Sequence, residues 1–288
     1  MLTKEQIAAV HDRVPAVPLE EYAEKYKDYL QMERKDGILV LKMHFQGGSA
    51  KWVHGLHNAL GCALKYIGQD KENGVLIITG AGDTWVGGLD PEYMQYMQAH
   101  SAQDHLSYSK TTYDDWYTDG HALLQNLLFD IDIPTIAAVN GPSPMGCHTE
   151  FALACDLTLA SEDANFGETH YVCGLAPGDG QYFTLRHLIG EKRANYLAVT
   201  GQQLTAKQAL DWGLINEVLP KDQVLPRAME LAKLFMQKDF YTRRLTHSIM
   251  SKSWREDCVK DYNEQFAMEG WAGAMNMPER HTEFEHKE

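Results

Sequence analysis

Three features that would each define a class of protein are scarce in this 288-residue sequence. It has only five cysteines, and because none forms a C-x-x-C pair they favour reduced thiols over a disulfide framework. No apolar run approaches the roughly 20 residues that span a bilayer. Residues 1–28 are polar and acidic, unlike a signal or transit peptide. These absences predict a cytoplasmic protein.

Basic residues are also scarce, with 26 Lys and Arg against 40 Asp and Glu, which gives a formal net charge of -14. An anionic surface repels phosphate backbones and anionic lipid, so neither nucleic acid nor a membrane is an expected partner. The hydrophobic share of 44% is that of an ordinary globular protein, and the length is ample for a buried core.

Strand and helix patterns alternate along most of the chain. Tyr29–Arg34 and Gly37–His44 predict a hairpin. Val53–Ile67 has apolar residues at helical spacing, and Gly74–Thr79 is an apolar run typical of a strand covered on both faces. The ββα spacing recurs, which predicts an α/β fold.

The later part of the chain is mainly helical. Thr205 and Gln208 form a capping-box pattern at the start of a short helix. We expect a lead-in segment at 1–28, a core domain at 29–219 and a helical oligomerisation region at 220–288. Further helices are expected at 115–129, 182–189, 191–200, 221–237 and 241–273.

The residues best suited to chemistry are concentrated between Pro134 and Gly180. Two short apolar runs there flank a Gly/Pro turn and a small helix, and His148, His170 and Asp179 fall within this one unit. Upstream, residues 100–115 are polar and aromatic without a clear period, which predicts an insertion or lid beside a site. Aromatic residues in and next to it are expected to shape the pocket: Tyr108, Tyr113, Trp116 and Tyr117.

Several ordered motifs over roughly residues 30–273 resemble the crotonase (enoyl-CoA hydratase/isomerase) superfamily. They are W-V-G-G-L-D, I-P-T-I-A-A-V-N-G, E-F-A-L-A-C-D-L-T-L-A-S-E-D-A-N-F-G, G-L-A-P-G-D-G and T-G-Q-Q-L-T-A. The resemblance implies a spiral of ββα repeats whose C-terminal helices form trimers, often paired into hexamers. It also implies that the segment carrying Leu89 supplies an oxyanion-hole amide.

The departures from the hydratase pattern are informative. A loop usually rich in glycine here reads P-S-P-M-G-C-H-T, with His148 where glycine is expected, and its prolines have no N–H to donate. His170 stands where a hydratase has a catalytic glutamate. Glu150 matches the family's other glutamate, which alone is not a hydratase pair.

These departures resemble the 6-oxocamphor hydrolase type of β-diketone hydrolase. That branch cleaves a carbon–carbon bond between two carbonyls without coenzyme A or another cofactor. Its histidine–aspartate pair matches His170 and Asp179, and its further histidine, tryptophan and glutamate match His148, Trp52 and Glu269.

The resemblance implies a retro-Claisen hydrolysis. His170 would activate water as a base near neutral pH, and Asp179 would fix its tautomer, as in a catalytic triad with water in place of serine. His148 and the Trp52 indole N–H would stabilise the developing oxyanion or enolate. The expected substrate is a small cyclic or bicyclic β-diketone, and the expected assembly is a homotrimer or a dimer of trimers.

Two other functions stay open from the sequence: a coenzyme A thioester hydratase or isomerase, and a non-catalytic interaction protein with the same fold. Structural interpretations also stay open. Asp179 can be a turn residue, Trp52 an apolar anchor, and Glu150 a partner for a backbone amide at a helix start. His54-x-x-His57 has metal-ligand spacing but lacks a third ligand, so no metal is expected.

Overall fold

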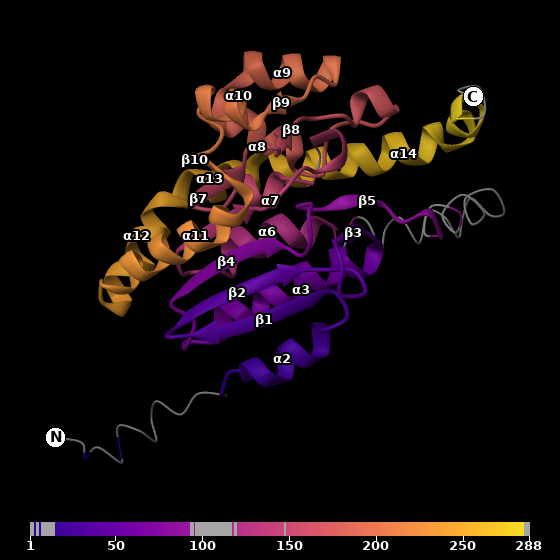
Figure 1. Ribbon diagram of the computed structural model, residues 1–288. Helices are drawn as coiled ribbons and strands as arrows, with labels where there is room; N and C mark the ends of the chain where they lie inside the picture. The colour runs from indigo at the N-terminus through magenta and orange to yellow at the C-terminus, as the bar shows by residue number, and fades with distance from the viewer. Residues whose placement is uncertain are drawn as a thin grey trace.

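The computed structural model describes residues 3, 6, 15–92, 95, 117, 120–146 and 148–284. Its centre is a six-stranded sheet in the order β1-β2-β4-β6-β7-β10 (Figure 1). Strands β1 and β2 are antiparallel, and the other neighbouring pairs are parallel. The strands are β1 (Leu30–Lys35), β2 (Ile38–Met43), β4 (Val75–Gly80), β6 (Thr135–Val139), β7 (Leu157–Ser161) and β10 (Glu217–Leu219).

The predicted hairpin is confirmed by the register of β1 and β2, in which Lys35 pairs with Ile38. Its turn places Asp36 at φ 52° and Gly37 at φ 79°. Both angles lie in the left-handed region that two-residue hairpin turns require and that Asp and Gly tolerate. The sequence Lys-Asp-Gly therefore ends one strand and begins the next.

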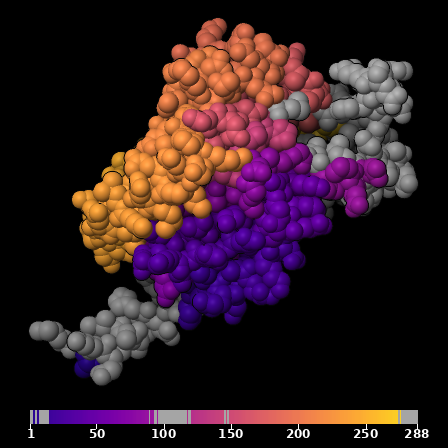
Figure 2. All heavy atoms as spheres, in the orientation of Figure 1, coloured from indigo at the N-terminus to yellow at the C-terminus, as the bar shows by residue number. Residues whose placement is uncertain are grey.

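Alternate residues of the central strands pack on opposite faces of the sheet. Leu76 and Ile78 join the larger core, which lies under helices α3 (His54–Gln69) and α6 (His121–Phe129). Ile77 joins a second core beneath helix α11 (Lys221–Met236), which packs on β4, β6 and β7. In the space-filling view the orange C-terminal helices lie beside the indigo N-terminal half (Figure 2). The prediction of a strand covered on both faces is confirmed.

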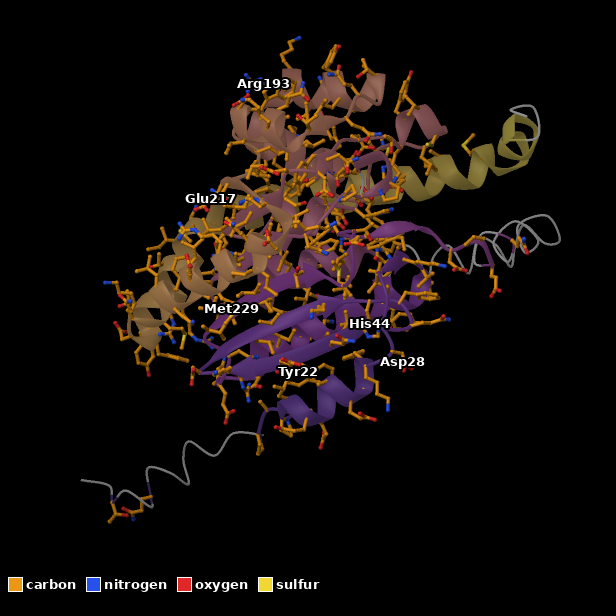
Figure 3. All side chains as sticks on the ribbon, viewed as in Figure 1. Tyr22, Asp28, His44, Arg193, Glu217 and Met229 are labelled. Atoms are coloured by element: carbon orange, nitrogen blue, oxygen red, sulfur yellow. The ribbon has the colours of Figure 1, made fainter. Side chains whose placement is uncertain are left out.

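Short elements frame the sheet. Helix α2 (Leu19–Tyr26) lies along β1, and Tyr22 lies between this helix and the sheet (Figure 3). Strand β3 (Lys51–Trp52) pairs with β5 (Gly87–Leu89), and β8 (Asn165–Phe166) pairs with β9 (Leu204–Thr205). The remaining short elements are η2 (Pro144–Gly146), α7 (Glu150–Leu153), η3 (Tyr171–Cys173), α8 (Gln181–Ile189), α9 (Glu191–Thr200) and α10 (Ala206–Asp211).

The capping box at the start of α10 is confirmed. Thr205 accepts from the backbone N–H of Gln208, and the Gln208 side chain accepts from the backbone N–H of Thr205. This exchange satisfies two donors that a helix start otherwise leaves free.

The prediction that residues 241–273 are helical is confirmed, but several helical segments follow one another there. They divide at Ser251, whose hydroxyl donates to the carbonyl of His247 at 2.8 Å. Such a bond to the preceding turn bends a helix, and it leaves no glycine or proline signal in the sequence. The segments are α12 (Phe240–Met250), α13 (Lys252–Asp257), the π-helical turn η4 (Cys258–Tyr262) and α14 (Asn263–Phe284), which extends toward the C-terminus in Figure 1. None of the helices in the described ranges is both long and apolar enough to cross a bilayer.

Helix α12 is attached to the sheet by a buried contact between a histidine and an aspartate. His247 is 4% exposed, and its Nδ1 lies 2.7 Å from Asp156 Oδ2. The other ring nitrogen faces the carbonyl of Ile131 at 3.2 Å. Both neighbours are acceptors, since Asp156 Oδ2 also accepts from the backbone and hydroxyl of Thr135.

Replacing His247 with alanine is expected to lower the free energy of unfolding by about 3 kcal/mol, because it leaves the buried Asp156 carboxylate without its imidazole partner. Chemical denaturation measures this value. The matched control is Thr246→Ala, an exposed polar residue of the same helix, where the change is expected to stay within about 0.5 kcal/mol. Equal effects of the two substitutions would contradict the role of the His247–Asp156 contact.

Candidate active site

His170 lies in the loop between β8 and α8, at the start of a tight turn. Its carbonyl accepts from the backbone N–H groups of Cys173 at 3.0 Å and Leu175 at 2.8 Å. Gly174 closes the turn at φ 76°, a conformation that glycine adopts without steric cost. The turn fixes the backbone from which the imidazole projects, and the side chain of His170 is 13% exposed.

Glu168 holds His170 at two points with one oxygen. Its Oε1 accepts the backbone N–H of His170 at 2.7 Å and lies 2.8 Å from the ring Nδ1. Glu168 is completely buried, and its Oε2 has no hydrogen-bond partner within the described part of the chain. Sequence reasoning missed this residue, although a glutamate two positions before the histidine was the available signal.

Two further carboxylates face the other ring nitrogen. Asp179 Oδ2 lies 3.5 Å and Glu269 Oε1 3.7 Å from Nε2 of His170. Asp179 is also held by its second oxygen, which accepts from the backbone N–H of Gln181 at the start of α8. Asp179 therefore faces the opposite nitrogen from the one that Glu168 binds.

Glu269 reaches this site from α14 because Gly178 lets the helix approach. A Cβ atom at Gly178 would lie 2.0 Å from the carbonyl of Gln265 in that helix. The backbone N–H of Gly178 donates to Glu269 Oε2 at 3.1 Å, and Glu269 is completely buried. The glutamate thus faces the His170 of its own chain.

The carboxylates determine the charge on His170. Burial alone would lower its pKa, but Asp179, Glu269 and Glu168 raise the pKa well above its ordinary value. Burial raises the pKa of Glu269 to about 8, and it also raises the pKa of Asp179. The surrounding carboxylates therefore favour the protonated form of the His170 imidazole.

Trp52 and His148 form an aromatic wall beside this group. Their rings stack with centroids 4.0 Å apart and planes 19° from parallel, and the ring of His57 lies 4.8 Å from that of Trp52. His148 has φ 58°, and its carbonyl accepts from the indole of Trp85 at 2.9 Å. His57 thus contacts a predicted site residue.

His148 is uncharged in this surrounding. Burial, with His170 and His57 nearby, places its pKa well below the ordinary value. The ring therefore has one N–H and one lone pair, and its Nδ1 has no partner among the described residues. One ring nitrogen is free to meet a ligand.

Glu150 lies at the start of α7 and is 2% exposed. Its Oε2 has no hydrogen-bond partner in the ranges that the structure describes. Burial and the neighbouring Asp179 raise its pKa well above the ordinary value, which favours the protonated form of this carboxyl group.

Two trios have potential ligand atoms within 4.8 Å of one another: His148 with Glu150 and Asp179, and Glu168 with His170 and Asp179. In the second trio Glu168 already binds Nδ1 of His170, which favours a shared proton over a metal ion there. The expectation that no metal is needed stays a prediction.

Backbone N–H groups of the loop before α7 are already hydrogen-bonded within the protein. The Ser143 N–H donates to Asn165 Oδ1, the Gly146 N–H to the Ser143 carbonyl, and the Thr149 N–H to Gln181 Oε1. These amides are therefore not free to bind a thioester oxygen. Leu89, whose segment is predicted to supply an oxyanion-hole amide, lies in β5 in register with Trp52 of β3. The predicted lid at 100–115, with Trp116, lies outside the described residues.

Known proteins share this fold and parts of this sequence. The enoyl-CoA hydratase/isomerase family profile matches residues 33–269. A probable mitochondrial enoyl-CoA hydratase of Dictyostelium discoideum is 33% identical over 62% of this chain and 59% of its own length. A crotonyl-CoA hydratase of Syntrophomonas wolfei is 29% identical over 68% of this chain and 70% of its own. The chain thus matches only about three fifths of the Dictyostelium protein's length.

A solved structure resembles the chain over more of its length. It is a β-diketone hydrolase from the cyanobacterium Anabaena, bound to (S)-3-oxocyclohexyl acetic acid. It is 31% identical, covers 90% of this chain and 98% of its own, and gives a TM-score of 0.79. The α/β crotonase fold predicted from the sequence is confirmed, and the chain belongs to the enoyl-CoA hydratase/isomerase family.

Proposed function

We propose that this protein is a cofactor-independent hydrolase that cleaves the carbon–carbon bond between the carbonyls of a cyclic or bicyclic β-diketone. The observation that carries the proposal is the imidazole of His170, bound at Nδ1 by Glu168 and facing Asp179 and Glu269 from Nε2. A hydratase of this family is expected to have a carboxylate at the position of His170. An imidazole backed by a buried carboxylate is suited to activating water.

The reaction has three steps, and the proton that the imidazole takes in the first is returned in the third. Nε2 of His170 takes a proton from water, and the resulting hydroxide adds to one carbonyl carbon. The bond to the carbon between the carbonyls then breaks, and its electron pair leaves as the enolate of the second ketone. That enolate carbon takes the proton back from the imidazolium, which gives a ketone and a carboxylic acid in one molecule.

The aromatic wall supports binding of the second carbonyl. His148 is uncharged and its Nδ1 has no partner among the described residues, so one of its ring nitrogens can donate to a ketone oxygen. Stacking on Trp52 fixes the plane of that ring. Neutral donors suit an uncharged diketone whose oxygen becomes negative only during reaction.

The ligand of the Anabaena structure supports the substrate class. That ligand, (S)-3-oxocyclohexyl acetic acid, is a cyclic ketone with a carboxylic acid side chain. The proposed hydrolysis can be reversed on paper by bonding the carboxyl carbon, with loss of water, to the ring carbon next to the ketone and farther from the side chain. The result is a bicyclic octanedione whose two carbonyls flank one bridgehead carbon. We therefore propose a bicyclic β-diketone of this kind as the substrate here.

The deciding experiment offers this octanedione without coenzyme A and, separately, crotonyl-CoA. The proposal expects a ring-opened keto acid from the first and no hydration of the second. The thioester alternative rests on the coenzyme A-dependent relatives, and it expects the reverse. No turnover of either compound, nor of other cyclic β-diketones, would favour the interaction-protein alternative.

Cleavage is expected to increase with pH through an acid limb above the ordinary histidine pKa of about 6.5. The base must be neutral to accept a proton, and the surrounding carboxylates raise the pKa of His170, so its neutral form appears only at higher pH. A profile of kcat/KM against pH measures this limb. A limb centred at or below the ordinary value would contradict His170 as the base.

We also propose that the active form is a homotrimer or a dimer of trimers. Large apolar side chains are exposed on the C-terminal helices, including Val259 at 69% and Trp271 at 68%. Burying such a surface against further copies of the chain is favourable. Light scattering after gel filtration tests the mass, and a monomer at micromolar concentration would exclude this assembly.

A further inference from the structure

Four carboxyl groups surround His170: Glu150, Glu168, Asp179 and Glu269. The imidazole pairs with the last three of them. Within the described residues, the ion pairs of Glu168, Asp179 and Glu269 are all with His170, and none is with Lys or Arg. Asp179 and Glu269 lie on the Nε2 side, beyond hydrogen-bond distance at 3.5 and 3.7 Å. Glu168 alone is within hydrogen-bond distance of the ring, on the Nδ1 side.

We propose that Glu168, not Asp179, is the positioning residue for His170, and that it keeps the Nδ1 proton in place while Nε2 exchanges protons with water. The proposal rests on the proposed function for the reaction that Nε2 serves. The residue that the family resemblance assigns to orientation, Asp179, lies instead beside the reacting nitrogen.

The geometry of Glu168 is suited to this role. One oxygen receives both the backbone N–H and the Nδ1–H of the same residue, so the ring cannot turn without losing a bond to a fully buried carboxylate. An ionised carboxylate accepts only, which requires a proton on Nδ1 and leaves the lone pair of a neutral ring at Nε2. In a catalytic triad the buried aspartate occupies this position behind the histidine.

The negative charge of Glu168 also contributes to the basicity of His170, as one of the three carboxylates that raise its pKa. Loss of that charge would therefore move the acid limb of activity to lower pH. Other titratable groups also face His170, and the substitution of Glu168 must leave them in place. They are Asp179 ahead of α8, Glu150 on α7, His148 ahead of α7, Glu269 on α14 and the Tyr262 hydroxyl behind Asp179.

The kinetic test compares Glu168→Gln with Glu168→Ala. Glutamine keeps an oxygen for both N–H groups and removes the charge, so kcat/KM is expected to fall roughly tenfold to a hundredfold and the acid limb to move to lower pH. Alanine removes both bonds and is expected to cost more. The matched control is Glu162→Gln, an exposed glutamate nearby in the chain, for which no change is expected. An unmoved acid limb in Glu168→Gln would overturn the proposal.

A spectroscopic test needs neither a folded Glu168 variant nor a substrate. Nitrogen NMR of the wild-type histidine rings, with His170 assigned by its loss in His170→Asn, reports which nitrogen carries the proton. The proposal expects Nδ1 of His170 to stay protonated throughout the titration while Nε2 titrates. A neutral ring protonated at Nε2 would overturn it. If β-diketones are not cleaved but Nδ1 stays protonated, the proposed function fails and the pairing with Glu168 stands.

Discussion

Replacing His170 with asparagine is expected to lower kcat for β-diketone cleavage by on the order of a thousandfold to ten-thousandfold. The asparagine amide nitrogen can occupy the place of Nδ1 and still donate to Glu168, which Nδ1 contacts at 2.8 Å. Nε2, the atom that faces Asp179 and Glu269, is removed. Steady-state kinetics with the bicyclic octanedione measures the loss.

The control for this substitution is His187→Asn. His187 also places Nδ1 near a carboxylate, 2.9 Å from Asp257, but it lies on α8 outside the site. Its replacement is expected to leave kcat within about twofold, while the melting temperature reports any effect on folding for both variants. Near-normal turnover by folded His170→Asn would show that another group activates water.

Replacing Asp179 with asparagine is expected to lower kcat by on the order of a hundredfold to a thousandfold. The amide oxygen can still accept from the Gln181 N–H, so the start of α8 is preserved. The amide nitrogen replaces the oxygen that lies 3.5 Å from Nε2, and the negative charge that favours the imidazolium is lost. The acid limb of kcat/KM is therefore expected to move to lower pH, because Asp179 is one of the groups that raise the pKa of His170.

The control for the aspartate is Asp163→Asn, which removes an exposed carboxylate that accepts from the Ser161 hydroxyl. Neither its turnover nor its pH profile is expected to change. If Asp179→Asn lost stability but kept its kcat and its acid limb, Asp179 would be a structural turn residue only.

Local patterns in the sequence predicted much of the fold. The apolar run of β4, the Asp36-Gly37 turn and the capping box of Thr205 each follow from residue periodicity or turn chemistry, and each is present. The division of the C-terminal helices at Ser251 was missed. It depends on a hydroxyl that bonds to the preceding turn, and this choice leaves no breaker residue in the sequence.

The site was less accessible to such reasoning, because its residues come from separate parts of the chain. The stacking of Trp52 on His148 and the bond from Gly178 to Glu269 join positions far apart in the sequence, and the family resemblance indicated these residues rather than periodicity. Glu168 was missed because its contact with His170 requires the loop to bring a backbone N–H and a ring nitrogen to one oxygen.

The most direct measurement is mass analysis of the product formed from the bicyclic octanedione in water enriched in heavy oxygen, without coenzyme A. A ring-opened keto acid with one solvent oxygen in its new carboxyl group is expected from the wild type and not from His170→Asn. Recovery of unchanged diketone, together with hydration of crotonyl-CoA by the same preparation, would contradict the proposed hydrolysis.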